Sequence, residues 1–138
     1  MKDLETARSK LKGNDLSLVI VKGGKAIFET KSSGIKGFLQ AIKMLDKRLT
    51  KSSVADKIMG RAAALLSVYS HVSAVFAVTI SKEGIRVLED NDIPYQFENC
   101  VPKILNSKGD DMCPLEKLTN TITNPAEAYS KLKSMIKT

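Results

Sequence analysis

The strongest candidate for a binding site is a charged segment that leads directly into an apolar run. Asp56, Lys57, Gly60 and Arg61 precede the sequence Ala-Ala-Ala-Leu-Leu of residues 62–66. This pattern predicts a buried helix that begins near Asp56, and the free N–H groups at a helix N-terminus favour an anion. Gly60 would let a ligand approach the backbone closely. Arg61 or Lys57 would pair with a phosphate or carboxylate group, and Asp56 would orient a hydroxyl group or the lysine.

A structural interpretation of the same four residues stays open. Asp56 would then cap the predicted helix, and Gly60 would allow tight packing. Lys57 and Arg61 would form an exposed pair one helical turn apart. Both interpretations place the four residues at the start of one helix.

Cys113 and Glu116 form a second candidate site, at the start of a short helix predicted from Cys113-Pro114-Leu115-Glu116. The partial positive charge at a helix N-terminus stabilises a thiolate, so Cys113 could act as a nucleophile with Glu116 as its proton acceptor. The alternative is that Cys113 is a small buried apolar residue. His71, the one histidine of the chain, is expected at the far end of the buried helix, and Cys100 is expected in the core.

Ser81 and Glu83 come at the beginning of a further predicted helix. Their simplest roles are an N-cap and a charge that is favourable in the first turn of a helix. A catalytic carboxylate at Glu83 is the alternative, but a single acid without a second acid or a metal ion does little chemistry.

The order of the predicted elements decides how these groups could meet. Two strand-like runs around Gly23-Gly24 predict a β-hairpin, and later strand–helix–strand units predict a mixed sheet between helical layers. Four strands are evident, and a fifth is expected around residues 103–105. The predicted helices cover residues 2–12, 35–48, 56–69 and 81–90, a short segment from 113 and a last segment from 125; the strands cover 16–21, 26–30, 74–80 and 95–101.

Composition sets limits on the class of protein. The chain has 138 residues, of which 43% are apolar and 27% charged, which is typical of one globular domain spanning residues 1–138. No apolar run approaches twenty residues, so no membrane-spanning helix is predicted. The first residues lack the apolar core of a signal peptide, and we expect a cytoplasmic protein with two reduced thiols.

Positive charge is concentrated in the first half of the chain. Residues 1–61 carry a net charge of +8 and the remainder −1, giving the total of +7. A basic half could attract nucleic acid or a phosphorylated ligand, although a solvated lysine-rich surface is the simpler interpretation. Aromatic residues make up only 5% of the chain and none lie among the lysines in an RNA-binding pattern, so nucleic acid is not the favoured partner.

The element order resembles the cytidine-deaminase-like fold. Four motifs together are similar to a small prokaryotic family described as a domain of unknown function, over residues 1 to about 136. These motifs are Asp56-Lys57, residues 60–64, Ser81-Lys82-Glu83 and residues 113–116. The resemblance implies a three-layer α/β fold with a mixed sheet of four to five strands that starts with an antiparallel hairpin and has helices on both faces. It also implies a homodimer.

The zinc ligands of working deaminases have no counterpart in the motifs of this chain. A zinc deaminase needs one His or Cys and two further Cys on the metal, with a Glu that transfers protons. Gly60-Arg61-Ala62 stands at the first position, and Ser81-Lys82-Glu83-Gly84 stands at the second without a thiol. We therefore expect no zinc, no other cofactor and no zinc-dependent deamination.

These observations lead to three hypotheses for function. The first is a catalytically inactive, deaminase-like protein that binds a small anionic, nucleotide-like ligand. The resemblance implies that its pocket is shared by residues 56–61 and 113–116, at the N-terminal ends of the helices that begin near Asp56 and Ser81. The second is an enzyme without a metal that uses Cys113 as its nucleophile. The third is a basic module that interacts with RNA or a partner protein.

Overall fold

The computed structural model describes residues 2–32 and 34–136, and its centre is a mixed five-stranded sheet. The strands lie in the order β2-β1-β3-β4-β5, and β1 is antiparallel to both of its neighbours. Strands β3, β4 and β5 are parallel. The strand bounds are β1 Leu18–Lys22, β2 Lys25–Thr30, β3 Ser53–Met59, β4 Ala74–Ser81 and β5 Tyr95–Val101.

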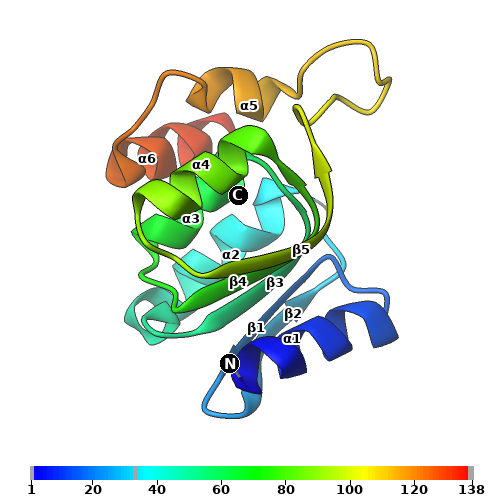
Figure 1. Cartoon of the computed structure of the whole chain (residues 1–138). Coiled ribbons are helices and arrows are strands. Elements are labelled where there is room, and N and C mark those ends of the chain that lie inside the picture. Colours follow the sequence, from blue (N-terminus) through cyan, green and yellow to red (C-terminus); the bar gives the residue numbers. More distant parts are fainter. Residues whose placement is uncertain (1, 33, 137–138) are drawn as a thin grey trace.

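Helices cover both faces of the sheet, as predicted (Figure 1). Helix α1 (Lys2–Gly13) packs on one face, over β1, β3 and β4. The other face is covered by α2 (Ile35–Leu45), α3 (Arg61–Tyr69) and α4 (Lys82–Asp90). Helix α6 (Pro125–Met135) packs on α3, and the short α5 (Pro114–Thr119) lies beside both. The molecule is therefore a three-layer α/β structure.

The hairpin between β1 and β2 forms where the two glycines predict it. Gly23 and Gly24 both have positive φ, 61° and 80°, which a tight hairpin turn requires and which glycine adopts without steric cost. Their N–H groups donate to the carboxylate of Asp3 at 3.0 and 2.9 Å. Asp3 therefore attaches the start of α1 to the tip of the hairpin.

The segment before Gly60 is a strand, and the prediction of a helix beginning near Asp56 was wrong. Residues 53–59 form β3, which pairs with β1 on one side and β4 on the other, and α3 begins only at Arg61. Two sheet neighbours determine this conformation, because they outweigh the weak local preference of a short segment that contains Asp56 and Lys57. Asp56 consequently does not cap a helix, and Lys57 and Arg61 are not neighbours on a helical face.

Three further differences concern smaller segments. The fifth strand is β3 rather than residues 103–105, where Leu105 makes an isolated bridge with Met112. Helix α2 ends at Leu45, and residues 46–49 continue as the 3₁₀ helix η1 (Asp46–Leu49). Cys100 is exposed on the edge strand β5 rather than buried in the core, because no strand pairs beyond β5 in the described sheet.

Among the described residues, no helix is long and apolar enough to cross a membrane.

Helices α3 and α4 both begin at the carboxyl edge of the parallel strands. The side chain of Ser81 accepts the N–H of Gly84 at 3.0 Å, so Ser81 caps α4 as predicted. Gly84 faces the turn between β3 and α3. A Cβ atom at this position would lie 3.0 Å from the carbonyl oxygen of Met59 and 3.3 Å from the carbonyl carbon of Gly60. The first turn of α4 is therefore held close to the turn at Gly60.

This close approach predicts opposite effects of alanine at two helical glycines. Gly84→Ala should lower the free energy of unfolding by about 1 kcal/mol or more, because the contact with backbone exceeds the gain in helix propensity. Gly13→Ala, where an added Cβ meets nothing within 4 Å, should leave stability unchanged or raise it. Urea denaturation of the two variants measures the difference, and equal effects would contradict the close packing of α4.

Candidate functional site

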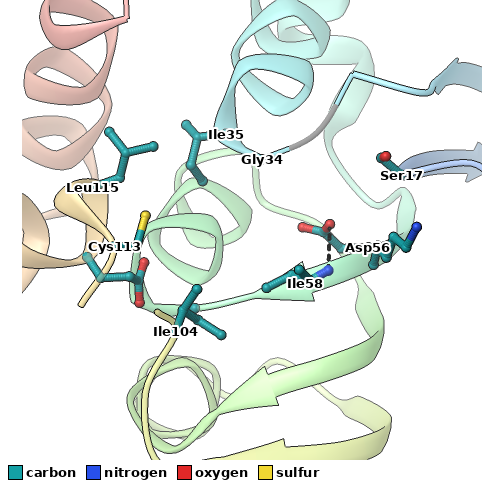
Figure 2. Close-up of a pocket in the computed structure, with 11 residues that line it drawn as sticks. Ser17, Gly34, Ile35, Asp56, Ile58, Ile104, Cys113 and Leu115 are labelled. Carbon is teal, nitrogen blue, oxygen red and sulfur yellow. Dashed lines mark hydrogen bonds between the residues drawn. The ribbon is translucent and has the colours of Figure 1, made fainter. Parts of the chain in front are cut away.

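A cavity of about 150 Å³ lies at the carboxyl end of β3 (Figure 2). It is bounded by the end of β3, the start of α2, the connection after β5 and the start of α5. Five of the eight predicted site residues line it, namely Asp56, Lys57, Gly60, Cys113 and Glu116. Residues of the segments 56–60 and 113–116 therefore lie around one cavity, while Arg61, Ser81 and Glu83 of the predicted site lie outside it.

The walls of this cavity are mostly apolar, and they come from segments that are far apart in the sequence. The apolar side chains are Ile35, Ile58, Ile104 and Leu115. Asp56 and Cys113 lie on opposite sides of the cavity (Figure 2). A ligand in this cavity would contact a carboxylate at one end and a thiol at the other.

The N-terminus of α3 is occupied by a carboxylate of the protein itself. Glu116 Oε1 accepts the N–H of Arg61 at 2.7 Å, and Oε2 accepts the N–H of Ala62 at 3.0 Å. A helix N-terminus favours an anion in this position, so Glu116 stands where the sequence predicted a bound ligand. Burial raises the pKa of Glu116, while the N–H groups of Ala62 and Arg61 and the charge of Arg61 lower it; burial has the larger effect.

Gly60 is explained by the same carboxylate. A Cβ atom at this position would overlap Glu116 Oε1 and would lie 2.7 Å from Oε2. The backbone conformation of Gly60, with φ −103° and ψ −163°, is open to any residue. Close approach of the Glu116 side chain, rather than a special backbone angle, is therefore what favours glycine here.

Arg61 is buried, and its guanidinium group is engaged by the protein. Nε donates to the carbonyl oxygen of Thr119 at 2.8 Å, and Nη2 donates to that of Ile122 at 2.6 Å. Nη1 forms an ion pair with Glu83 at 3.1 Å. The side chain joins the start of α3 to the end of α5 and to the turn that follows α5. Arg61 does not line the cavity at the end of β3, although the sequence suggested it as a partner for a ligand phosphate.

Ser81 and Glu83 also lie outside the cavity at the end of β3. With Arg61 they line a separate space of about 30 Å³, which is near the volume that one water molecule occupies. Glu116 lines both spaces. Its carboxylate therefore lies between the cavity at β3 and the small space at the start of α4.

Asp56 is the other carboxylate that lines the cavity at the end of β3. It is half-buried, and Oδ1 accepts the N–H of Ile58 at 3.3 Å. Burial raises the pKa of Asp56 to about 7, against the smaller opposing effects of backbone N–H groups at Ile58 and Lys57. Lys57 has 56% of its side chain exposed and lies 3.9 Å from Asp15, so it belongs to the rim of the cavity.

Some of the lining could not be found from the sequence. Ser17, Gly34, Ile104 and Leu115 carry no local signal of a site, because they approach the cavity only through the sheet and the fold of the C-terminal segment. Within residues 2–32 and 34–136, no three His, Cys, Asp or Glu side chains converge in a group that could hold a metal ion.

Comparison with known proteins identifies similarity to one family. A family model described as TM1506, domain of unknown function (DUF1893), matches residues 6–136. The structure is similar to the crystal structure of a DUF1893 family protein (TM1506) from Thermotoga maritima, with a TM-score of 0.89 and 30% sequence identity over 97% of this chain and 90% of that chain. No curated protein matches the chain.

A double-mutant cycle tests whether Glu116 is the reason for Gly60. Gly60→Ala should lower the free energy of unfolding by about 2 kcal/mol, because the new methyl group displaces the carboxylate from α3. The same change in a Glu116→Ala background should cost at least about 1 kcal/mol less, since the overlapping atoms are gone. Urea denaturation of the four proteins gives the coupling energy. An equal cost in both backgrounds would contradict the explanation.

Proposed function

The chain belongs to the DUF1893 family, whose function is unknown, and we propose that it binds a small ring-containing molecule in the cavity at the carboxyl end of β3. The observation that supports this is a cavity of about 150 Å³ with apolar walls and a single free carboxylate at Asp56. An apolar cavity of about that volume in another protein accommodates benzene, so this one has room for one ring. The rest of a larger ligand would lie outside.

A nucleotide-like ligand fits this description if only its base enters the cavity. The anionic part would then remain at the rim, where Lys57 is the cationic residue among those that line the cavity. Arg61 and the N-terminus of α3, which the sequence suggested for this role, are bound to carbonyl groups and to Glu116. Lys57 is therefore the residue to which we assign the anionic group.

We further propose that the protein is a catalytically inactive relative of the deaminases. The starts of α3 and α4 are the two places where that resemblance expects zinc ligands. An ion pair between Arg61 and Glu83 joins these two helix starts, and Glu116 binds the first N–H groups of α3. A salt-bridged network of this kind supplies no open coordination position and no metal-bound water.

A non-metal enzyme that uses Cys113 is the second candidate, because the thiol lines the same cavity. Glu116, which the sequence suggested as the proton acceptor, has each oxygen engaged by an N–H group of α3. A nucleophile needs a base within hydrogen-bond reach. Binding without turnover is therefore the function that the geometry favours, and time-dependent modification of Cys113 by a substrate would favour the enzyme instead.

Binding of pyrimidine and purine monophosphates, and of the corresponding free bases, tests the proposed function. Protein-observed NMR titration should detect binding to the wild type. Ile104→Phe, which fills the cavity, should weaken it at least tenfold, whereas Leu105→Phe, on an exposed neighbour outside the cavity, should not. Lys57→Ala should weaken the monophosphates more than the bases. No binding by any of these probes, or equal binding to Ile104→Phe, would contradict the proposal.

A further inference from the structure

Asp56 is an acid placed among apolar neighbours in an inner strand. In the register of the sheet it stands opposite Leu18 of β1 and Ala77 of β4, both of which are buried. Paired residues of adjacent strands project on the same face of a sheet, so Asp56 has an apolar neighbour on each side. No ion pair involves Asp56 among the residues that the structure describes.

The carboxylate keeps acceptor capacity that the described protein groups do not use. An ionised carboxylate has about four acceptor positions, and the described side chains and backbone supply one hydrogen bond, from the N–H of Ile58 at 3.3 Å. The carboxylate of Asp56 lies at the cavity and faces the start of α2 at Gly34 (Figure 2). A buried acceptor is stabilised when a donor reaches it, so this end of the cavity favours a donor.

Two other polar side chains of the cavity, those of Ser17 and Glu116, are engaged by the protein itself. The hydroxyl group of Ser17 donates to the carbonyl oxygen of Lys31 at 3.1 Å, and both oxygens of Glu116 accept N–H groups of α3. Lys57 extends to the exposed rim beside Asp15, and Cys113 lies on the opposite side of the cavity from Asp56. Asp56 is thus the group with which a ligand inside the cavity can form a charge-assisted hydrogen bond.

We infer that the cavity selects rings that carry a nitrogen donor, with Asp56 accepting the N–H group of an amino or amidino substituent while the ring lies against the isoleucine side chains. This inference rests on the proposed function and adds the chemical class of the group that enters the cavity. A ring that places a carboxylate at this end of the cavity would instead bring a second negative charge against the Asp56 carboxylate. Selection between such rings is therefore set by Asp56.

Three rings of similar size provide the test: benzamidine, benzoate and fluorobenzene. At pH 7.5 benzamidine should bind the wild type at least tenfold more tightly than benzoate, as measured by NMR titration. Asp56→Asn should remove this preference, because the amide retains an acceptor for Ile58 but loses the charge. Asp15→Asn, which removes an exposed carboxylate near Lys57, should keep the preference.

The pH dependence is a second readout of the same inference. Benzamidine needs the ionised form of Asp56, so its affinity should fall about tenfold between pH 7.5 and pH 5.5 in the wild type and stay constant in Asp56→Asn. Lys57, Asp15, Cys113 and Glu116 are the other titratable groups near the cavity, and all are retained in both proteins.

Fluorobenzene, followed by ¹⁹F NMR, separates the two proposals. If fluorobenzene binds in the cavity but benzamidine has no advantage over benzoate, or keeps that advantage in Asp56→Asn, the inference is overturned while ring binding stands. If none of the three rings binds, both the inference and the proposed function are overturned.

Discussion

The hydrogen bonds between the Glu116 carboxylate and the first N–H groups of α3 determine how this end of the molecule is built. They join residues that are 55 and 54 positions apart in the chain. Because the carboxylate lies against Gly60, a side chain at that position would displace it. The same contact fixes the start of α5, and with it Cys113 and Leu115, along one side of the cavity. Without it, two free N–H groups would remain buried at the start of α3, which is costly.

Arg61 provides further contacts between the start of α3 and the region of α5. Its backbone N–H binds Glu116, and its guanidinium group binds the carbonyl oxygens of Thr119 and Ile122. The residue at the start of α3 thus holds α5 and the turn that follows it against α3. An anion that binds at this helix would have to displace Glu116. No described side chain fills the neighbouring cavity in the way that Glu116 fills the site at the start of α3. We therefore assign ligand binding to the end of β3 rather than to the start of α3.

Local sequence signals predicted the elements that depend on local chemistry. Gly23-Gly24 marked the hairpin, and Ser81 marked the start of α4. The last helix was predicted from residue 125, where α6 begins, and the side chain of Asn124 accepts the N–H of Glu127 at 3.1 Å. The sequence did not predict β3 as a strand, because the conformation of β3 is set by pairing with β1 and β4. The charged residues Asp56 and Lys57 also interrupt its short apolar pattern. A tertiary pairing of this kind leaves little trace in a single sequence.

The candidate site could also be predicted from the sequence only in part. The family resemblance, supported by the chemistry of helix N-termini, suggested one pocket for Asp56, Gly60, Cys113 and Glu116, and the four residues line one cavity. Their partners could not be inferred, since the distance along the chain between Arg61 and its acceptors at Thr119 and Ile122 hides the contact. The sequence therefore suggested a ligand as one possible partner of Arg61, whereas backbone carbonyl groups of the protein bind it.

A pH titration of the backbone amide resonances of Arg61 and Ala62 by ¹⁵N NMR tests the central interaction most directly. Because both N–H groups donate to Glu116, their shifts should change together as its carboxyl group titrates. The midpoint should lie above the ordinary value of about 4.3 for glutamate, since burial raises the pKa of Glu116, and the transition should be absent in Glu116→Gln. Amide shifts that stay constant in the wild type, or that titrate equally in Glu116→Gln, would contradict the account.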